Sequence, residues 1–277
     1  MLRDAVQECR EALERGGIEN SGYEARCMIE HLTGYSRAAQ LAHAGEPFDR
    51  REELERMIQR RLRHEPLQYI LGSWTFCGFP FSVGEGVLIP RDDTEVVLGL
   101  CLDYLKSKPH AKALDLCAGS GAIAVALSKL SDCEMTAVEL SEKAFYFLRK
   151  NIEDNQAAVT PVRGDIFRCH NDFPDGCFDL IVSNPPYIRR SELPDLQAEV
   201  HFEPAMALDG GESGYDFYET IIRDWSGKLR SGGCLAFELG EEQAEYVSRL
   251  MEARGFTNIR TENDFGGIQR AIIGTLL

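Results

Sequence analysis

The chain has 277 residues, of which 44% are hydrophobic and 27% charged, so it can bury a core and is not a disordered protein. Its 30 basic and 45 acidic residues give a net charge of −15, which disfavours a protein that depends on phosphate contacts with nucleic acid or anionic membrane. The apolar stretches are too short to span a bilayer, and the first residues lack the apolar core of a signal peptide. We therefore expect a cytoplasmic protein with no membrane partner.

The nine cysteines do not indicate a disulfide framework. Their number is odd, and no two of them have the Cys-x-x-Cys spacing of zinc knuckles and redox motifs. We expect reduced, mostly buried thiols and no bound metal.

The first quarter of the chain has the pattern of helices. Apolar residues recur with the helical period in three runs, and Gly or Pro ends each run. The runs cover residues 5–13, 25–32 and 51–64, and the breaks are Gly16, Gly34 and Pro66. This pattern predicts a small helical domain over residues 1–66, for which we hypothesise a role in substrate recognition.

Residues 67–90 have a different pattern, which predicts a β-hairpin linker. Residues 69–76 have the composition of two short strands around a turn at Gly72 and Ser73. Several glycines and Pro80 interrupt the segment that follows.

Residues 91–277 alternate apolar strands with helices. Strands are predicted at residues 113–116, 135–138, 160–163, 178–183, 234–239 and 271–276. A helix is predicted at residues 122–129, and Ser141 is a candidate cap for the next one. Such alternation predicts an α/β domain with a mainly parallel sheet and helices on both faces.

A Gly-rich loop lies where the first of these strands meets the first helix. Its candidate ligand-binding residues are Asp115, Cys117, Ala118, Gly119, Ser120 and Gly121. In an open parallel sheet this crevice is the usual ligand site, because the glycines admit close backbone approach and the helix start offers free N–H groups. Glu139 ends the second strand, 20 residues after Gly119, where an acid can accept both hydroxyls of a ribose. The pattern alone leaves S-adenosylmethionine and NAD open.

A second candidate site follows the strand at 178–183. It consists of Asn184, Pro185, Pro186 and Tyr187. The prolines stiffen the backbone and keep carbonyl acceptors without adding N–H donors. Asn184 adds a side-chain carbonyl, and Tyr187 adds an aromatic wall. Such a pocket suits a planar –NH2 group, whose two N–H bonds meet two acceptors.

Asn-Pro-Pro-Tyr in a Rossmann-like domain resembles the S-adenosylmethionine-dependent amino methyltransferases. More of the chain is similar to the HemK/PrmC family, whose members methylate a glutamine of peptide chain release factors. The segments that carry this resemblance are residues 65–72, 87–95, 115–122, 184–188, 203–211, 237–243 and 264–270. The resemblance implies a Rossmann-like methyltransferase domain over residues 91–277, with an antiparallel last strand, after the helical domain and the hairpin linker.

The resemblance also implies a reaction and a partner. A methyl group would pass from S-adenosylmethionine to the side-chain amide of the Gln in a release factor's Gly-Gly-Gln motif. Asn184 and Pro185 would grip the substrate amide, with Pro186, Tyr187 and Arg91 beside it. We expect a monomer that makes no direct contact with nucleic acid.

For the cofactor, the resemblance adds five residues to the Gly loop and Glu139. Asp165 would reach the adenine, and Ile166 or Phe167 would pack against its ring. Thr94 would line the methionine end, while Asn184 borders both cofactor and substrate. The family commonly has Gly where this chain has Cys117, so the backbone at that position is of interest.

Several alternatives share parts of this pattern. The same chemistry could methylate a ribosomal-protein glutamine or, in an adenine-N6 DNA methyltransferase, a flipped-out base. The acidic charge and the absence of a basic recognition domain argue against DNA. An NAD-dependent oxidoreductase would need a catalytic His or a Tyr/Lys pair near the crevice, and a binding module without activity would not need Asn184 and Tyr187.

Overall fold

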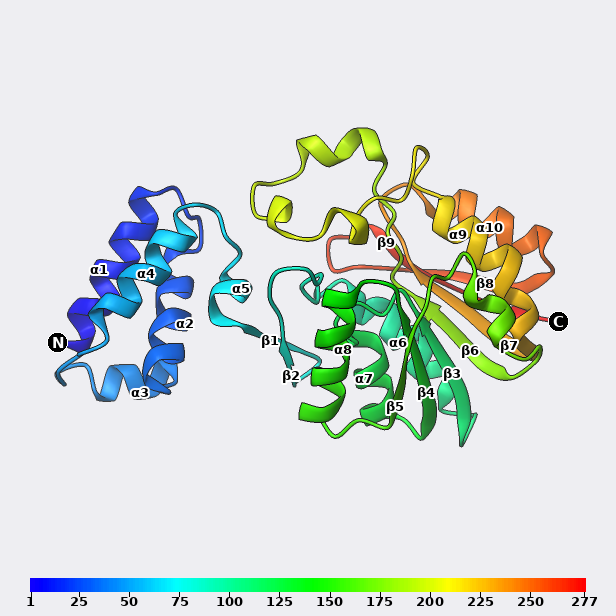
Figure 1. Cartoon of the computed structure of the whole chain (residues 1–277), viewed down its shortest axis with the longest axis horizontal. Coiled ribbons are helices and arrows are strands. Elements are labelled where there is room, and N and C mark those ends of the chain that lie inside the picture. Colours follow the sequence, from blue (N-terminus) through cyan, green and yellow to red (C-terminus); the bar gives the residue numbers. More distant parts are fainter. The chain divides into compact units, whose positions relative to one another are not determined.

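The computed structural model describes all of residues 1–277, which form two compact units (Figure 1). The first unit comprises Met1–Ser73 and, from far along the chain, Gln197–Phe202. The second comprises Trp74–Leu196 and Glu203–Leu277. The first unit therefore extends beyond the helical segment expected from the sequence and includes a short piece of the later chain.

The first unit is helical. Its helices are α1 (Leu2–Arg15), α2 (Ser21–Thr33), α3 (Arg37–Ala42), α4 (Arg51–Arg61) and α5 (Leu67–Leu71). Helices α1, α2 and α4 pack against one another and bury their apolar faces between them. Gly34 ends α2 in the left-handed conformation, with φ 72°, as its position after the apolar run predicts.

A buried ion cluster joins the late segment to these helices. The Arg61 side chain is 8% exposed, and its Nε donates to Glu24 Oε2 over 2.6 Å. Its Nη2 donates to Glu199 Oε1 over 3.0 Å. Because Glu199 belongs to Gln197–Phe202, this charge cluster ties that segment into the first unit.

The predicted hairpin is displaced along the chain. The sequence indicated a strand from Tyr69 and a turn at Gly72, but Leu67–Leu71 is the short helix α5. Pro66 stands directly before this helix in the N-cap position, and Gly72 ends it with φ 72°. The hairpin consists of β1 (Ser73–Phe76) and β2 (Phe79–Ser82).

The physical reason is in the turn. Cys77 and Gly78 both have positive φ, 48° and 79°, as a tight two-residue hairpin turn requires. A short apolar run such as residues 69–71 does not by itself distinguish strand from helix.

The second unit is built on a seven-stranded sheet of order β5-β4-β3-β6-β7-β9-β8 (Figure 1). The strands are β3 (Ala111–Leu116), β4 (Cys133–Glu139), β5 (Val159–Arg163), β6 (Phe178–Ser183), β7 (Leu229–Glu238), β8 (Phe256–Asn263) and β9 (Gln269–Leu276). Strands β3 to β7 pair in parallel, whereas β9 is antiparallel to both β7 and β8. The expected mainly parallel sheet with an antiparallel last strand is confirmed.

The strand β8 was not predicted. Its residues alternate between half-buried and exposed, and only Phe256 is fully buried. As an edge strand with many polar residues it lacks the apolar run that marks the central strands.

Helices cover both faces of the sheet. They are α6 (Thr94–Leu105), α7 (Ala122–Leu130), α8 (Glu142–Asp154), α9 (Asp216–Thr220) and α10 (Ala244–Ala253), with a π-helical turn at Ile221–Trp225 after α9. The buried Leu114, Leu116 and Phe237 pack with Tyr218, Trp225 and Val247 in one core. The neighbouring strand residue Asp115 points to the other face, where its Oδ2 accepts from Ala124 N in α7.

Candidate active site

The carboxyl ends of the central strands meet one pocket in the second unit. Strand β3 lies between β4 and β6, so the strand order reverses beside it, which is where open α/β sheets bind ligands. The predicted residues that line this pocket are Arg91, Thr94, Asp115, Cys117, Ala118, Gly119, Ser120, Glu139, Asp165, Ile166, Phe167, Asn184 and Pro186. The pocket therefore joins the Gly loop to the Asn-Pro-Pro-Tyr segment.

The Gly loop is held by main-chain contacts to the next strand. Ala118 N donates to Val138 O over 3.0 Å, and Gly119 N donates to Glu139 Oε2 over 2.8 Å. Gly121 does not line the pocket; it caps α7 with φ 84°, and a Cβ there would lie 2.6 Å from Leu148. The fold therefore requires glycine at this position.

Cys117 occupies a glycine-like backbone position. Its φ is 61°, in the left-handed region that side chains rarely adopt. Burial raises the pKa of its thiol well above the ordinary value, so the neutral thiol is the stable form. The Gly loop thus has a cysteine in a backbone conformation that favours glycine.

Two buried acids lie beneath the loop. Glu139 accepts from Gly119 N and, through Oε1, from Ser141 N over 2.7 Å. Burial raises the pKa of Glu139, and burial raises that of Asp115 well above its ordinary value. Asp115 Oδ1 is buried without a hydrogen-bond partner.

These acids fit a cationic ligand. A positive charge in the pocket would satisfy the unpartnered Asp115 oxygen and favour the ionised form of both carboxylates. S-adenosylmethionine carries two positive groups, a sulfonium and an ammonium. Glu139 accepts only two hydrogen bonds from the protein, so its carboxylate has lone pairs left for the ribose hydroxyls that are expected there.

The segment after β5 forms another wall of the pocket. Asp165 Oδ1 accepts from Phe167 N over 3.0 Å, so a local turn fixes the carboxylate. Ile166 is buried, and its carbonyl accepts from Trp225 Nε1 over 3.0 Å. Phe167 is 43% exposed and makes an edge contact with Phe217 at 5.1 Å between centroids. An apolar wall beside a fixed acid suits an aromatic base.

The Asn-Pro-Pro-Tyr segment presents acceptors. Asn184 Nδ2 donates to Thr94 Oγ1 over 3.3 Å. Neither Asn184 Oδ1 nor the Pro185 carbonyl accepts a hydrogen bond from the protein. Asn184 and Pro186 line the pocket, whereas Pro185 is buried outside its lining.

Tyr187 is anchored at both ends instead of lining that pocket. Its hydroxyl donates to Glu238 Oε1 over 3.2 Å, and its carbonyl accepts from Gln243 Nε2 over 3.0 Å. A Cβ at Gly210 would lie 2.7 Å from Tyr187 Cα, so only glycine lets the backbone at residue 210 pass so close to the backbone of Tyr187.

Arg91 is paired with an acid that the sequence did not assign. Its Nη2 donates to Glu203 Oε1, while Glu203 Oε2 accepts from Ile89 N over 2.9 Å. Glu203 is only 5% exposed, and burial raises its pKa. The Arg91 side chain as a whole is 40% exposed and lines the pocket.

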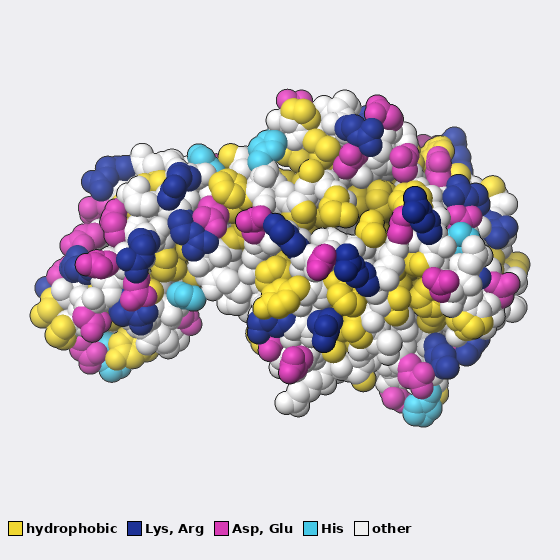
Figure 2. Space-filling model, viewed as in Figure 1, with side chains coloured by type: hydrophobic (Ala, Val, Ile, Leu, Met, Phe, Trp, Pro, Cys, Tyr) yellow, Lys and Arg dark blue, Asp and Glu magenta, His cyan; other side chains and the backbone are white.

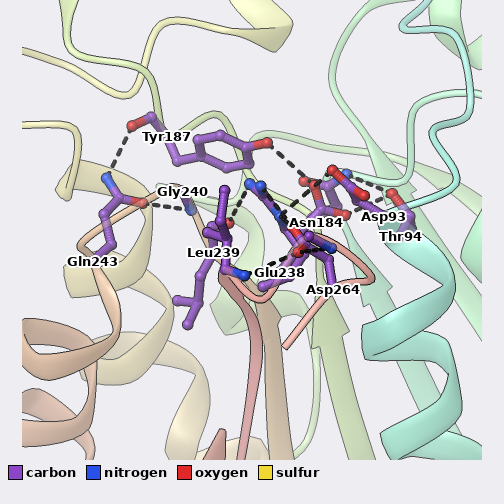
Figure 3. A network of polar contacts seen from close by, with 12 residues as sticks. Asp93, Thr94, Asn184, Tyr187, Glu238, Leu239, Gly240, Gln243 and Asp264 are labelled. Carbon is purple, nitrogen blue, oxygen red and sulfur yellow. Dashed lines mark hydrogen bonds and ion pairs between the residues drawn. The ribbon is translucent and has the colours of Figure 1, made fainter. Parts of the chain in front are cut away.

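Behind Asn184 lies a polar network that the sequence did not reveal (Figure 3). Thr94 Oγ1 donates to Glu238 Oε2 over 2.6 Å. Arg270 donates to Asp264 and to the Leu239 carbonyl, and its Nε lies 3.5 Å from Asp93. The segments 237–243 and 264–270, which contribute to the family resemblance, include Glu238, Asp264 and Arg270, but no local sequence pattern gave these residues a role.

The chain contains no group of three or more His, Cys, Asp or Glu residues placed to hold a metal ion. Nor is any of its helices long and apolar enough to cross a membrane. On the face drawn in Figure 2, basic and acidic side chains are interspersed rather than gathered into one basic field.

Comparisons with known proteins agree with this geometry. Residues 4–72 match the family described as "PrmC N-terminal domain", and residues 97–213 match "Methyltransferase small domain". A "Release factor glutamine methyltransferase" of Geobacter sulfurreducens is 40% identical, covering 99% of this chain and 96% of its own length. The protein of the same name from Bordetella pertussis is 36% identical, covering 91% of this chain and 94% of its own length.

Solved structures show the same fold. A methyltransferase from Pyrococcus furiosus has a TM-score of 0.55 and 21% identity, covering 78% of this chain and 98% of that one. The catalytic domain of hMettl16 has a TM-score of 0.56 and 14% identity, covering 71% and 76%. The expected Rossmann-like methyltransferase fold is confirmed.

Proposed function

The chain belongs to the family of release factor glutamine methyltransferases, and from that premise we propose that it methylates the Gln of a release factor's Gly-Gly-Gln motif on the side-chain amide nitrogen. S-adenosylmethionine, the cofactor of the family, supplies an activated methyl group when bound. The observation that carries the proposal is the unused acceptor Asn184 Oδ1 of a residue that lines a pocket suited to this cofactor; the carbonyl of the next residue, Pro185, is likewise unused by the protein.

A carboxamide nitrogen is a poor nucleophile, because its lone pair is delocalised into the carbonyl. Asn184 Oδ1 and the Pro185 carbonyl accept its two N–H bonds and hold the nitrogen in line with the methyl carbon. As the new N–C bond forms, the bond from the methyl carbon to the sulfonium sulfur breaks and the sulfur becomes neutral, so the nitrogen gains positive charge and its N–H groups become stronger donors. The two acceptors then bind the transition state more tightly than the ground state, which is the condition for catalysis. The extra proton then leaves the nitrogen for water.

In the same proposal, the remaining pocket residues hold the cofactor. The Gly loop, with Asp115, would hold its amino-acid part, Glu139 would accept from its ribose, and Asp165, Ile166 and Phe167 would hold its base, since all of them line the same pocket. Tyr187, fixed at both ends, keeps Asn184 and Pro185 in place, and Arg91 remains beside the substrate end.

The test is a methyl-transfer assay with the full chain, S-adenosylmethionine and a purified release factor, followed by digestion and mass measurement of the Gly-Gly-Gln peptide. We expect one added methyl group on that Gln. A release factor with alanine in place of this Gln is the matched control and should stay unmodified.

Replacement of Asn184 tests the mechanism. We expect Asn184→Ala to lower kcat roughly a hundredfold or more while cofactor affinity changes little, by analogy with the loss of one preorganised hydrogen-bond partner. Unchanged kcat in a folded variant would contradict the role of Asn184.

If the protein binds S-adenosylmethionine but leaves the release-factor peptide unmodified, the cofactor assignment stands and the substrate is another one. Ribosomal-protein glutamines are then the next substrates to assay, followed by adenine in DNA, which shares the demand for two acceptors on an –NH2 group.

A further inference from the structure

A chain of hydrogen bonds runs from a buried acid to the proposed amide-gripping residue (Figure 3). Asn184 Nδ2 donates to Thr94 Oγ1 over 3.3 Å, and Thr94 Oγ1 donates to Glu238 Oε2 over 2.6 Å. Tyr187 donates to the other oxygen, Oε1, over 3.2 Å. Glu238 is 1% exposed and lies at the end of β7, behind the pocket.

The direction of this chain depends on its last member. An ionised carboxylate only accepts, so Thr94 must turn its single hydroxyl proton toward Glu238. The Thr94 oxygen then accepts from Asn184, whose amide can contribute only its NH2 group. The Asn184 oxygen is left to face the pocket, as a substrate N–H requires.

We propose that Glu238 is a positioning residue for methyl transfer: its carboxylate, acting through the Thr94 hydroxyl, makes Asn184 present its oxygen rather than its NH2 group to the substrate nitrogen. This inference rests on the proposed function of Asn184. A neutral group at position 238 can donate to Thr94, which frees the Thr94 proton for Asn184 Oδ1 and lets the amide turn its NH2 group to the substrate.

Two hydroxyls and one cation near Glu238 partly offset the free-energy cost of burying its negative charge. Burial raises the pKa of Glu238 to about 7, although the Thr94 and Tyr187 hydroxyls and the charge of Arg270 lower it. The titratable and charged groups that face it are Asp93 before α6, Tyr187 after β6, Tyr218 on α9, Arg270 on β9, and Asp264, which is paired with Arg270. The carboxylate therefore titrates near neutral pH.

The first experiment compares pH profiles of kcat for the full chain and for Glu238→Gln, which keeps the shape and removes the charge. For the original chain, kcat should fall as the pH decreases through about 7, because protonation of Glu238 releases Asn184. Glu238→Gln should have a kcat roughly tenfold to a hundredfold lower at alkaline pH and should lack the acidic fall. Its dissociation constant for S-adenosylmethionine, measured by calorimetry, should stay within about twofold.

Glu241→Gln is the matched control, since Glu241 is exposed three residues further along the same segment. It should keep both the kcat and the pH profile of the original chain. If Glu238→Gln behaves like this control, the inference is overturned.

Thr94 provides an independent variant should Glu238→Gln fold poorly. Thr94→Val removes the relay hydroxyl with little change of shape and should reproduce the lowered, flat profile, whereas Thr94→Ser should restore both kcat and the acidic fall. Combining Thr94→Val with Glu238→Gln should cost little more than either change alone, because both break one relay. If the fold-decrease of kcat in the double variant equals the product of the two single fold-decreases, the two residues act independently and a shared relay is contradicted.

Asn184→Ala separates the two proposals. If it is inactive while Glu238→Gln and Thr94→Val keep a normal kcat and acidic fall, the inference fails and the proposed function stands. If Asn184→Ala methylates the release factor normally, the proposed function of Asn184 fails, and the relay with it.

Discussion

At the scale of single residues, the site combines ordinary side chains with unusual surroundings. Cys117 adopts a backbone conformation that favours glycine, Asp115 has a buried oxygen without a partner, and Glu238 is a carboxylate at 1% exposure. Each feature costs folding free energy, and each lies at or directly behind the pocket. Such local costs are typical of functional sites.

Cys117 allows a test of the loop conformation. Because φ is 61°, we expect Cys117→Gly to bind S-adenosylmethionine within about threefold of the original affinity, since glycine adopts this conformation without strain. Cys117→Val should weaken binding or lower the unfolding midpoint, because a β-branched residue is strongly disfavoured at positive φ. Calorimetric titration and thermal unfolding measure the two effects. Equal behaviour of the Gly and Val variants would contradict the backbone argument.

The raised pKa of Glu238 predicts a conflict between stability and activity. The folded state binds this proton more tightly than the unfolded state, so the stabilisation is present below about pH 4.5 and is lost as the pH rises through about 7. Glu238→Gln cannot ionise, so at alkaline pH it should keep up to about 3 kcal/mol of unfolding free energy that the original chain loses. At about pH 8 its thermal unfolding midpoint should exceed that of the original chain, and the difference should shrink toward about pH 5. A lower midpoint at alkaline pH would contradict the burial cost.

At the scale of elements, the segment between Ile188 and Asp209 is the notable one. Its ends are bridged in the second unit, where Ile188 N donates to Leu208 O and Gly210 N donates to Ile188 O. Its middle, Gln197–Phe202, belongs to the first unit. The segment that follows the proposed catalytic residues thus has its own anchor among the helices.

That anchor is the Arg61 cluster, whose two acids should contribute unequally to stability. Glu24 is 11% exposed and makes two bonds to Arg61, so Glu24→Ala should destabilise α2 and α4 by about 3 kcal/mol, since it leaves a buried cation short of a partner. Glu199 is 34% exposed, so Glu199→Ala should cost less than about 1 kcal/mol. Hydrogen exchange of the amides in both helices measures this order. The reverse order would contradict the importance of burial.

At the scale of the whole molecule, the chain carries a net charge of −15, and its visible face mixes both signs (Figure 2). A protein that grips DNA through phosphates would lose affinity steeply as salt rises. We expect no measurable binding of duplex DNA even at low salt, by fluorescence anisotropy with labelled DNA. Tight binding that weakens with added salt would instead favour the DNA methyltransferase alternative.

Patterns that extend over one turn or one strand were sufficient to predict most elements. The central strands, the helix after the Gly loop and the Ser141 cap were found where predicted, because apolar periodicity and capping chemistry are local. The hairpin was predicted too early in the chain and β8 was missed, since a short apolar run and a polar edge strand carry weak local signals.

The sequence by itself determined the fold class, the Gly loop and the Asn-Pro-Pro-Tyr segment, because each follows from residues that are neighbours in the chain. Only the tertiary structure decided that Thr94 meets Glu238 across 144 residues, that Asn184 meets Thr94 across 90, and that Arg61 meets Glu199 across 138. These contacts depend on strand order and on the return of distant loops to one edge of the sheet. No periodicity or turn chemistry encodes such pairs one at a time, because the cooperative packing of the whole chain brings them together.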